Sequence, residues 1–248
     1  MSDAGSADPA IAVVVGASGG LGRALAELMV ESGAYERVVA LSRRRPDGWE
    51  DNARRAWAAV DILDEDSIAA GARLVATLGV PIRIVVATGR LSGFELKPEK
   101  SMRALDADAL RELFAVNAVG PALVAKHLLP LTPRDRSSLF AAISARVGSI
   151  GDNRLGGWYG YRASKAALNM FIRTLAIEHR RARPNGVCVA LHPGTVKTAL
   201  SAPFQSGVPD EKLFSPERSA TALLQVMDAL GPGDTGGFFA WDGAKIPW

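Results

Sequence analysis

The chain of 248 residues is 48% apolar and carries a formal net charge of +3 without a long basic tract, which argues against nucleic acid or a membrane as a partner. Its single cysteine, Cys188, excludes an internal disulfide and a multi-cysteine metal site, and no apolar stretch approaches the ~20 residues of a membrane span. We therefore expect a cytoplasmic protein without a metal, with one domain over residues 1–248 and a flexible tail at residues 1–9.

Strand patterns and helix patterns alternate along the whole chain. The first strand is predicted at 11–15, and the helix after it begins near Leu21 and ends at Gly33. The other strands are predicted at 37–42, 57–62, 82–87, 138–144, 187–191 and 237–241, and the other helices at 65–78, 108–129, 159–179 and 215–230. Pro121 would interrupt or kink the helix at 108–129, and Cys188 would be a buried structural thiol. This alternation predicts an α/β fold: a single-domain, Rossmann-like, doubly wound parallel sheet with helices on both faces.

A glycine-rich turn separates the first strand from its helix. Gly16, Gly20 and Gly22 stand in the spacing Gly-x-x-x-Gly-x-Gly. Strand, glycine turn and helix in this order form the opening unit of a dinucleotide-binding fold. The glycines let the backbone approach a pyrophosphate, and the helix N-terminus offers unpaired N–H groups to it. The alternative is a tight turn that binds no ligand.

Tyr161 and Lys165 stand four residues apart in the predicted helix at 159–179, so they share one helix face. A phenol titrates near ~10, and a cation held close favours the phenolate and lowers its pKa towards the working range. Tyr159 is a rival phenol, but Ala163 stands four residues after it. Together with the glycine turn, the Tyr161–Lys165 pair indicates chemistry on a bound nucleotide.

The end of the second predicted strand bears on the choice of cofactor. In NAD users a carboxylate at this point accepts the adenosine 2′-hydroxyl, but here Ser42 is followed by Arg43 and Arg44. Guanidinium groups bind a 2′-phosphate, which a carboxylate would repel. We therefore predict NADP(H), with Arg43 as the nearer contact. The alternative is a solvated basic turn.

Over nearly its whole length the chain resembles the short-chain dehydrogenase/reductase family. The resemblance rests on four features in the family's order: the turn with Gly16, Gly20 and Gly22, then Asn117 in the central helix, then Tyr161-x-x-x-Lys165, then Pro193-Gly194 with Thr198. One subgroup of the family has local sequences similar to those of this chain at 144–150, at 157–165 and at the ending 241–248. It comprises C-factor-like proteins and sniffer-type carbonyl reductases.

The resemblance implies a role for each matched residue. Tyr161 would donate a proton to a carbonyl or accept one from an alcohol, Lys165 would lower the phenol pKa and hold the nicotinamide ribose, and Asn117 would bind a relay water through its backbone. Asp61 would contact the adenine, and Thr198 with the Pro193-Gly194 turn would hold the carboxamide. The implied cofactor-binding set is Gly16, Ser18, Gly20, Leu21, Gly22, Ser42, Arg43, Arg44, Asp61, Ile62, Ala87, Gly89, Pro193, Gly194, Val196 and Thr198. Alternatives are an ordinary helix polar residue for Asn117, a capping or turn residue for Asp61, and a plain strand-ending turn for Pro193-Gly194.

Two positions depart from the family's pattern. Ala145 stands where the family has a serine that hydrogen-bonds the substrate oxygen. Ser144 is the predicted catalytic replacement if a bulge re-aims it, since a regular strand would turn it to the opposite side, and Ser149 in the loop is the other candidate. The second departure is Val-Ala-Thr-Gly at 86–89, where the family often has Asn-Asn-Ala-Gly; Gly89 is kept.

The leading hypothesis is an NADP(H)-dependent oxidoreductase that reduces a ketone or aldehyde, or oxidises the alcohol, with Tyr161 as proton donor or acceptor. A nucleotide-binding, C-factor-like signalling or regulatory protein is the alternative, and the altered serine position favours it. A scaffold without nucleotide is a third interpretation. Leu91, Trp158 and the segment 200–214 would line an apolar pocket for a small carbonyl or alcohol substrate. The family likeness also implies a possible homodimer or homotetramer.

Overall fold

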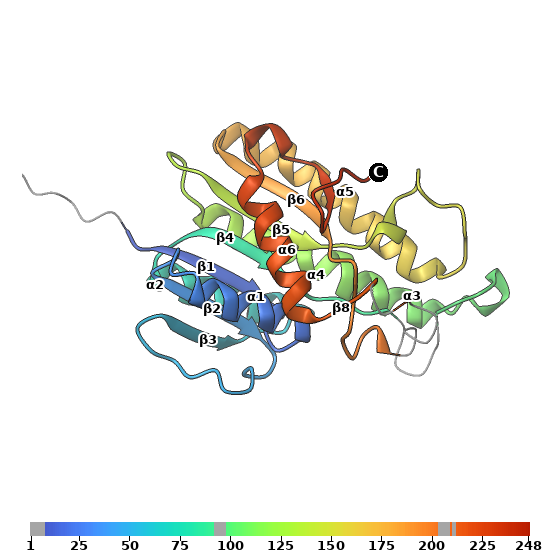
Figure 1. Cartoon of the computed structure of the whole chain (residues 1–248), viewed down its shortest axis with the longest axis horizontal. Coiled ribbons are helices and arrows are strands. Elements are labelled where there is room, and N and C mark those ends of the chain that lie inside the picture. Colours follow the sequence, from blue (N-terminus) through green and yellow to red (C-terminus); the bar gives the residue numbers. More distant parts are fainter. Residues whose placement is uncertain (1–7, 92–97, 203–208, 210–211) are drawn as a thin grey trace, which may run out of the picture.

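A computed structural model describes residues 8–91, 98–202, 209 and 212–248 of the chain. Its centre is a seven-stranded parallel sheet with the strand order β3-β2-β1-β4-β5-β6-β9 (Figure 1). Most of the tail predicted at 1–9 lies outside the described residues. The strands are β1 (Ala10–Val15), β2 (Arg37–Ser42), β3 (Arg55–Ala59), β4 (Val80–Val86), β5 (Ser138–Ile143), β6 (Gly186–His192) and β9 (Phe238–Ala240).

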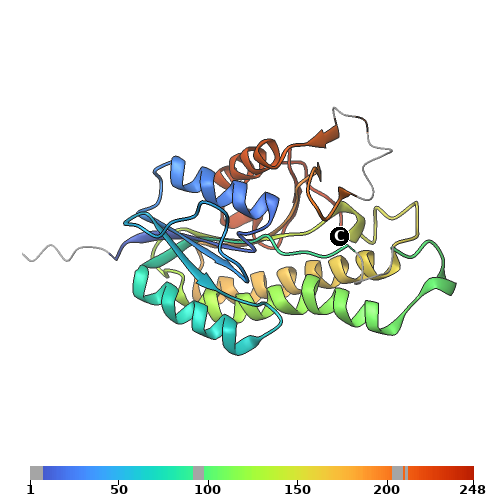
Figure 2. The same cartoon turned by 90° about the horizontal axis from the view of Figure 1, so that it is seen from below.

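Helices cover both faces of this sheet (Figure 2). The helices α1 and α6 pack on one face, and α2, α4 and α5 pack on the other. The predicted doubly wound α/β class is therefore confirmed. The helices are α1 (Gly20–Glu31), α2 (Glu65–Leu78), α3 (Ala107–Phe114), α4 (Gly120–Leu128), α5 (Tyr159–Ala182) and α6 (Pro216–Ala229).

Alternating residues of each strand supply the two cores. In β1, Val13 and Val15 join the core beneath α2, α4 and α5, whereas Ala12 and Val14 join the core beneath α1 and α6. Burial on both faces explains why these strands are continuous apolar runs. Cys188 of β6 is fully buried, and burial raises the pKa of its thiol to about 12. The predicted buried thiol is confirmed.

Strand β3 differs from its predicted bounds of 57–62, because it begins at Arg55 and ends at Ala59. The chain turns after Val60, and the Asp61 carboxylate accepts the Leu63 N–H at 3.0 Å. Asp64 then caps α2 by accepting the N–H groups of Asp66 and Ser67. Asp61 and Ile62 therefore lie in the turn before α2, not in the strand.

The helix predicted at 108–129 consists of three joined pieces. Between α3 and α4 lies η2 (Ala115–Val119), a π turn, and Pro121 stands in the first turn of α4. The expectation that no apolar stretch reaches spanning length is wrong here, since Ala107–Leu131 is long and apolar enough by length and composition. Core helices of soluble proteins share this length and composition, and half of the apolar window is buried against other elements.

A second, two-stranded sheet follows β6. Its strands β7 (Thr195–Val196) and β8 (Leu213–Phe214) pair in parallel, and the sequence analysis missed both because two residues carry no periodicity. The pairing brings the segment after β6 to the start of α6. Short 3₁₀ turns complete the fold: η1 (Met102–Ala104), η3 (Leu129–Leu131), η4 (Arg146–Gly148) and η7 (Pro232–Asp234).

Candidate active site

The first turns of α5 place Tyr161 and Lys165 on the helix face that packs towards the sheet. Tyr161 is 9% exposed and Lys165 is 2% exposed. The Lys165 ammonium donates to the carbonyl oxygen of Ile143, the last residue of β5, at 2.8 Å and lies 6.0 Å from the centre of the Tyr161 ring. The phenol and the ammonium thus meet at the carboxyl edge of the sheet.

Burial shifts both groups towards their neutral forms. It raises the pKa of the Tyr161 phenol above its usual value and lowers the pKa of the Lys165 ammonium to about 7. In this structure the burial of the phenol outweighs any stabilisation of the phenolate by Lys165, so the phenol pKa is raised where the sequence predicted it to fall. The physical reason is that desolvation opposes both charges, and the ammonium hydrogen-bonds a strand-end carbonyl.

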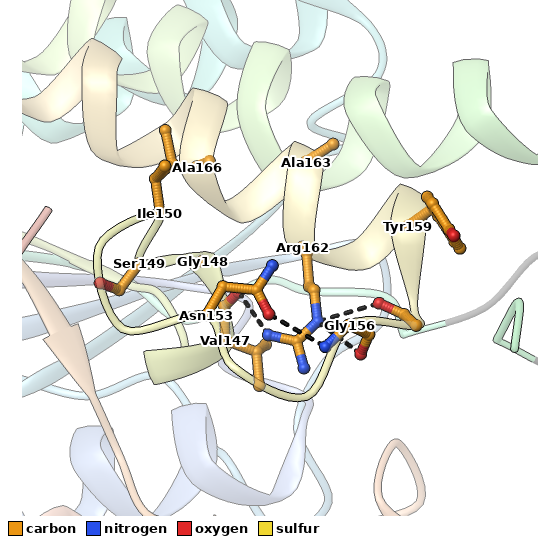
Figure 3. A pocket seen from close by; sticks show the side chains of 11 residues that line it. Val147, Gly148, Ser149, Ile150, Asn153, Gly156, Tyr159, Arg162, Ala163 and Ala166 are labelled. Carbon is orange, nitrogen blue, oxygen red and sulfur yellow. Dashed lines mark hydrogen bonds between the residues drawn. The ribbon is translucent and has the colours of Figure 1, made fainter. Parts of the chain in front are cut away.

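Tyr159, the rival phenol, lies on the opposite side of α5 and is 42% exposed. It lines an outer cavity of about 470 Å³ together with Ala163, as Figure 3 shows. Arg162 spans this cavity and donates to the carbonyl oxygens of Val147, Gly156 and Gly157. Among the residues that the structure describes, no lysine pairs with Tyr159, which does not face the sheet edge.

Asn117, in the π turn, is fully buried. Its side chain forms two hydrogen bonds with the main chain of Arg90: it accepts from the N–H at 2.8 Å and donates to the carbonyl oxygen at 2.7 Å. It also donates to the Ser164 hydroxyl at 3.0 Å, and that hydroxyl donates to the Tyr161 carbonyl oxygen. The side chain of Asn117 therefore ties the segment after β4 to the turn of α5 that carries Tyr161 and Lys165.

Neither candidate serine presents a free hydroxyl. Ser144 donates to the side-chain oxygen of Asn169 at 2.6 Å, on the α5 side of the sheet, and its N–H continues the ladder with β6 at Leu191. No bulge re-aims it. Ser149 donates to the carbonyl oxygen of Pro247. Ala145, between strand and loop, is half-buried, so the substrate-binding role of Ser144 stays a prediction that this geometry does not favour.

The glycine turn has the shape that an anion site needs. Gly16 has φ 87°, and a side chain on Gly22 would place its Cβ 2.3 Å from the Gly16 carbonyl oxygen. No side chain caps α1 at Gly19, and its first turn holds no acidic residue. The N–H groups and the positive dipole end of α1 are therefore available to a phosphate.

Close contacts join this turn to the Tyr161–Lys165 pair along the sheet edge. A Cβ on Gly20 would lie 3.1 Å from the Thr198 methyl group. A Cβ on Gly89, three residues after β4, would lie 3.6 Å from the Lys165 ammonium nitrogen and 3.7 Å from the Asn117 side-chain oxygen. Residues predicted from five distant parts of the chain thus lie close together at this edge of the sheet.

The remaining predicted cofactor residues lie along the same edge or beside it. Gly194 has φ 77°, and the Pro193 carbonyl oxygen accepts a hydrogen bond from the Ser219 hydroxyl. In the glycine turn Ser18 is exposed, and at the start of α1 Leu21 is buried. Ile62 packs against Gly120, and Ala87 follows β4. Val196 is buried in β7.

At the end of β2, Arg43 and Arg44 are exposed, and no carboxylate pairs with either among the residues that the structure describes. Ser42 is turned inward: its hydroxyl donates to the Arg44 carbonyl oxygen and accepts from the Trp57 indole. Arg45 forms two hydrogen bonds to Asp51 and lies over the Trp57 ring. The local structure thus separates two free arginines from a third that is structural, a distinction that the sequence did not make.

The substrate side of the site includes a strained residue. Trp158 has φ 52°, and its ring meets Tyr161 edge-on with 6.3 Å between centroids. Leu91 is buried and Leu200 approaches Gly89, and their role in lining a substrate pocket stays a prediction. Residues 203–208 and 210–211 of the predicted lining lie outside the described part of the chain. Within that part, no three His, Cys, Asp or Glu side chains gather as a metal site.

Known proteins resemble this chain both in sequence and in fold. The short chain dehydrogenase family model matches residues 10–208. The C-signal protein of Myxococcus xanthus is 34% identical over 169 residues, which cover 68% of this chain and 93% of that protein. The NADPH-bound carbonyl reductase from chicken fatty liver aligns with a TM-score of 0.81 at 25% identity, over 98% of this chain and all of the other. The carbonyl reductase Sniffer of D. melanogaster, at 21% identity and the same TM-score and coverage, shows a shared fold.

Proposed function

The chain belongs to the short-chain dehydrogenase family, and we propose that it is an NADP(H)-dependent oxidoreductase that reduces a ketone or aldehyde, or oxidises the matching alcohol. One observation carries this proposal. A Cβ on Gly89, at the same sheet edge as the glycine turn, would come within contact distance of Lys165 and Asn117. A dinucleotide with its phosphates at α1 would then extend towards Tyr161.

NADPH, when bound, supplies a hydride to the substrate carbonyl carbon. Tyr161 supplies the proton to the carbonyl oxygen, and its raised pKa keeps the phenol protonated until charge develops on that oxygen. Lys165 stabilises the resulting phenolate when it is itself protonated. Asn117 and Ser164 hold the turn of α5 that carries both groups. The chain thereby positions the two reactants and excludes water from the phenol.

For the cofactor, we propose NADP(H) over NAD(H). Two exposed arginines at the end of β2, with no carboxylate beside them, suit a 2′-phosphate. The NADPH-bound chicken carbonyl reductase, of the same fold, supports this choice. Fluorescence titration with both cofactors tests it. We expect R43A to weaken NADPH binding about tenfold and NADH binding little. R45A is the matched control, because Arg45 already pairs with Asp51. Equal binding of the two cofactors by the wild-type chain would refute the assignment.

Replacement of Tyr161 by phenylalanine tests the reaction itself. Y161F removes the proton donor but little volume, so NADPH should still bind while turnover on a reducible carbonyl falls about a hundredfold or more. Y159F is the matched control, because Tyr159 faces the outer cavity. Near wild-type turnover by Y161F would show that the proposed mechanism is wrong.

A second candidate function is a nucleotide-binding signalling role with little catalysis. The engaged hydroxyls of Ser144 and Ser149, with Ala145 between strand and loop, favour it, as does the likeness to the C-signal protein. A panel of ketones and aldehydes with NADPH separates the two functions. Tight NADPH binding without oxidation of the cofactor by any of them would favour the signalling role.

Self-association and location complete the proposal. Met170, Phe171 and Ile177 of α5 are exposed, which supports a homodimer or homotetramer through the helical face. Light scattering of the pure protein would report its mass, and a monomer at working concentration would refute it. The cytoplasmic location stays a prediction.

A further inference from the structure

Glu99 is a buried carboxylate close to the proposed site. It is 6% exposed, and it lies in the segment between β4 and α3. Among the residues that the structure describes, no lysine, arginine or histidine forms an ion pair with it. A buried charge is costly unless other groups compensate it.

The compensation comes from the start of α5. The Gly160 N–H donates to the Glu99 carboxylate at 3.3 Å, and the Trp158 N–H donates to the Glu99 main-chain carbonyl oxygen at 2.5 Å. No side chain within α5 caps this end at Trp158. Since the N-terminus of a helix carries a positive dipole end, the carboxylate of Glu99 serves as its missing cap.

The fit around this contact is tight. A Cβ on Gly160 would lie 2.8 Å from a carboxylate oxygen of Glu99 and 2.7 Å from a methyl group of Leu113. Trp158, one residue from the helix start, is in the left-handed region, and no other non-glycine residue of the described chain has a positive φ. Such a conformation persists only where surrounding contacts hold it. One of the two bonds to Glu99 comes from the N–H of Trp158 itself, and the other comes from Gly160, two residues later.

We propose that Glu99 is a positioning residue for the reaction: its carboxylate and carbonyl fix the first turn of α5, and thereby the direction of the Tyr161 phenol and the Trp158 ring. The inference rests on the proposed function, since Tyr161 is the proton donor there. Tyr161 follows Gly160 directly, so a shift of this turn moves the phenol relative to the substrate. Small misplacements of reacting groups lower turnover strongly.

The test compares three variants. E99A removes the cap, E99Q keeps an acceptor of the same size without the charge, and D64A removes the side-chain cap of α2, which carries no predicted catalytic residue. We expect E99A to lower kcat about tenfold, E99Q about threefold, and D64A not at all. The melting temperatures of E99A and D64A should fall by similar amounts. The NADPH dissociation constant should be unchanged in all three, because the glycine turn is untouched.

Hydrogen exchange separates this inference from the proposed function. The amides of Trp158 and Gly160 should exchange faster in E99A and E99Q than in wild type, whether or not a reducible substrate is found. If Y161F keeps turnover, the proposed function fails. Hydrogen exchange of the Trp158 and Gly160 amides still tests whether Glu99 holds the first turn of α5. Wild-type kcat in E99A, or unchanged exchange at the start of α5 in E99Q, would overturn the role of Glu99. E99Q also covers the case in which E99A does not fold.

Discussion

Pro121, in the first turn of α4, stands four residues after Asn117, which lies in the π turn that precedes this helix. In a regular helix the Asn117 carbonyl would accept the N–H of residue 121, but proline has none. The Gly120 N–H donates to Ala115, five residues back. The Asn117 carbonyl therefore lacks its usual helix donor, at the place where the Asn117 side chain contacts Ser164, the neighbour of Lys165. A buried carbonyl without a helix partner is a site for water.

Replacement of Pro121 by alanine should therefore separate stability from activity. P121A supplies an N–H that pairs with the freed carbonyl, so the melting temperature should stay or rise. If a water at this carbonyl passes protons to Lys165, kcat should fall several-fold, to about tenfold. Thermal unfolding and steady-state NADPH oxidation measure the two effects. P130A, in η3 beyond α4, is the matched control. An unchanged kcat in P121A would contradict a role for this carbonyl.

Lys165 should give the reduction a pH dependence near neutrality. Burial lowers its pKa to about 7, so the protonated fraction falls as the pH rises through that value. The phenolate of Tyr161 needs the charged ammonium, whereas the phenol itself stays protonated because burial raises its pKa. We expect kcat for reduction to be high below pH 7 and to decrease above it, measured from pH 5.5 to 9.

The variant K165M should be slow and should lose this step, since it has no group that titrates there. A K165M profile that keeps the wild-type step would assign the titration to another residue. A wild-type kcat that rises through pH 7 would contradict the need for a charged Lys165.

His179 should make the fold sensitive to acid. It is buried near the end of α5, and a Cβ on Gly186 would lie 2.6 Å from its ring nitrogen. Burial, and then the charge of Arg183, lower its pKa from 6.5 to about 4. The unfolded chain therefore binds a proton between pH 6.5 and 4 that the folded chain does not, and stability is lost as the pH falls through this window.

The size of this effect follows from about 1.4 kcal/mol for each pKa unit, which gives roughly 2–3 kcal/mol at pH 4. Urea unfolding at several pH values measures it. The variant H179Q lacks the titrating group, so its free energy of unfolding should fall less between pH 6.5 and 4. Equal losses in H179Q and wild type would show that His179 does not carry the effect.

Local patterns in the sequence predicted the parts of the site that local physics determines. Gly16 and Gly22 were recognisable because only glycine tolerates their φ and their close approach, and Tyr161 with Lys165 because a helix aligns residues four apart. Pro121 signalled an interruption but not a π turn, since the kind of interruption depends on packing.

Contacts between distant segments could not be predicted in this way. Glu99 caps a helix that begins sixty residues later, and nothing in its own neighbourhood indicates a cap. The hydroxyl of Ser144 looked available in sequence, yet Asn169 of α5 takes it. Because side chains alternate along a strand, the sequence did predict that a regular strand turns Ser144 away from the side of Ala145. Its partner is known only once α5 is packed against β5.

Ala145 offers the most direct test of how this chain differs from its family. Its backbone is extended, with φ −148°, a conformation that serine adopts without strain. A hydroxyl there would stand beside the strand end where Lys165 meets Ile143. We expect A145S to raise kcat for carbonyl reduction about tenfold, because a hydrogen bond to the substrate oxygen strengthens as charge develops on it. Steady-state rates with a fixed ketone measure the change.

S144A is the matched variant, because Ser144 already donates to Asn169 and so has no hydroxyl proton left for a substrate. S144A should keep wild-type kcat but lose about 1 kcal/mol of stability, since the Asn169 oxygen would be left buried without its donor. If S144A instead abolishes turnover and A145S adds nothing, Ser144 leaves Asn169 during the reaction and fills the family's serine role. The two substitutions together therefore decide which residue holds the substrate oxygen, or whether Tyr161 holds it alone.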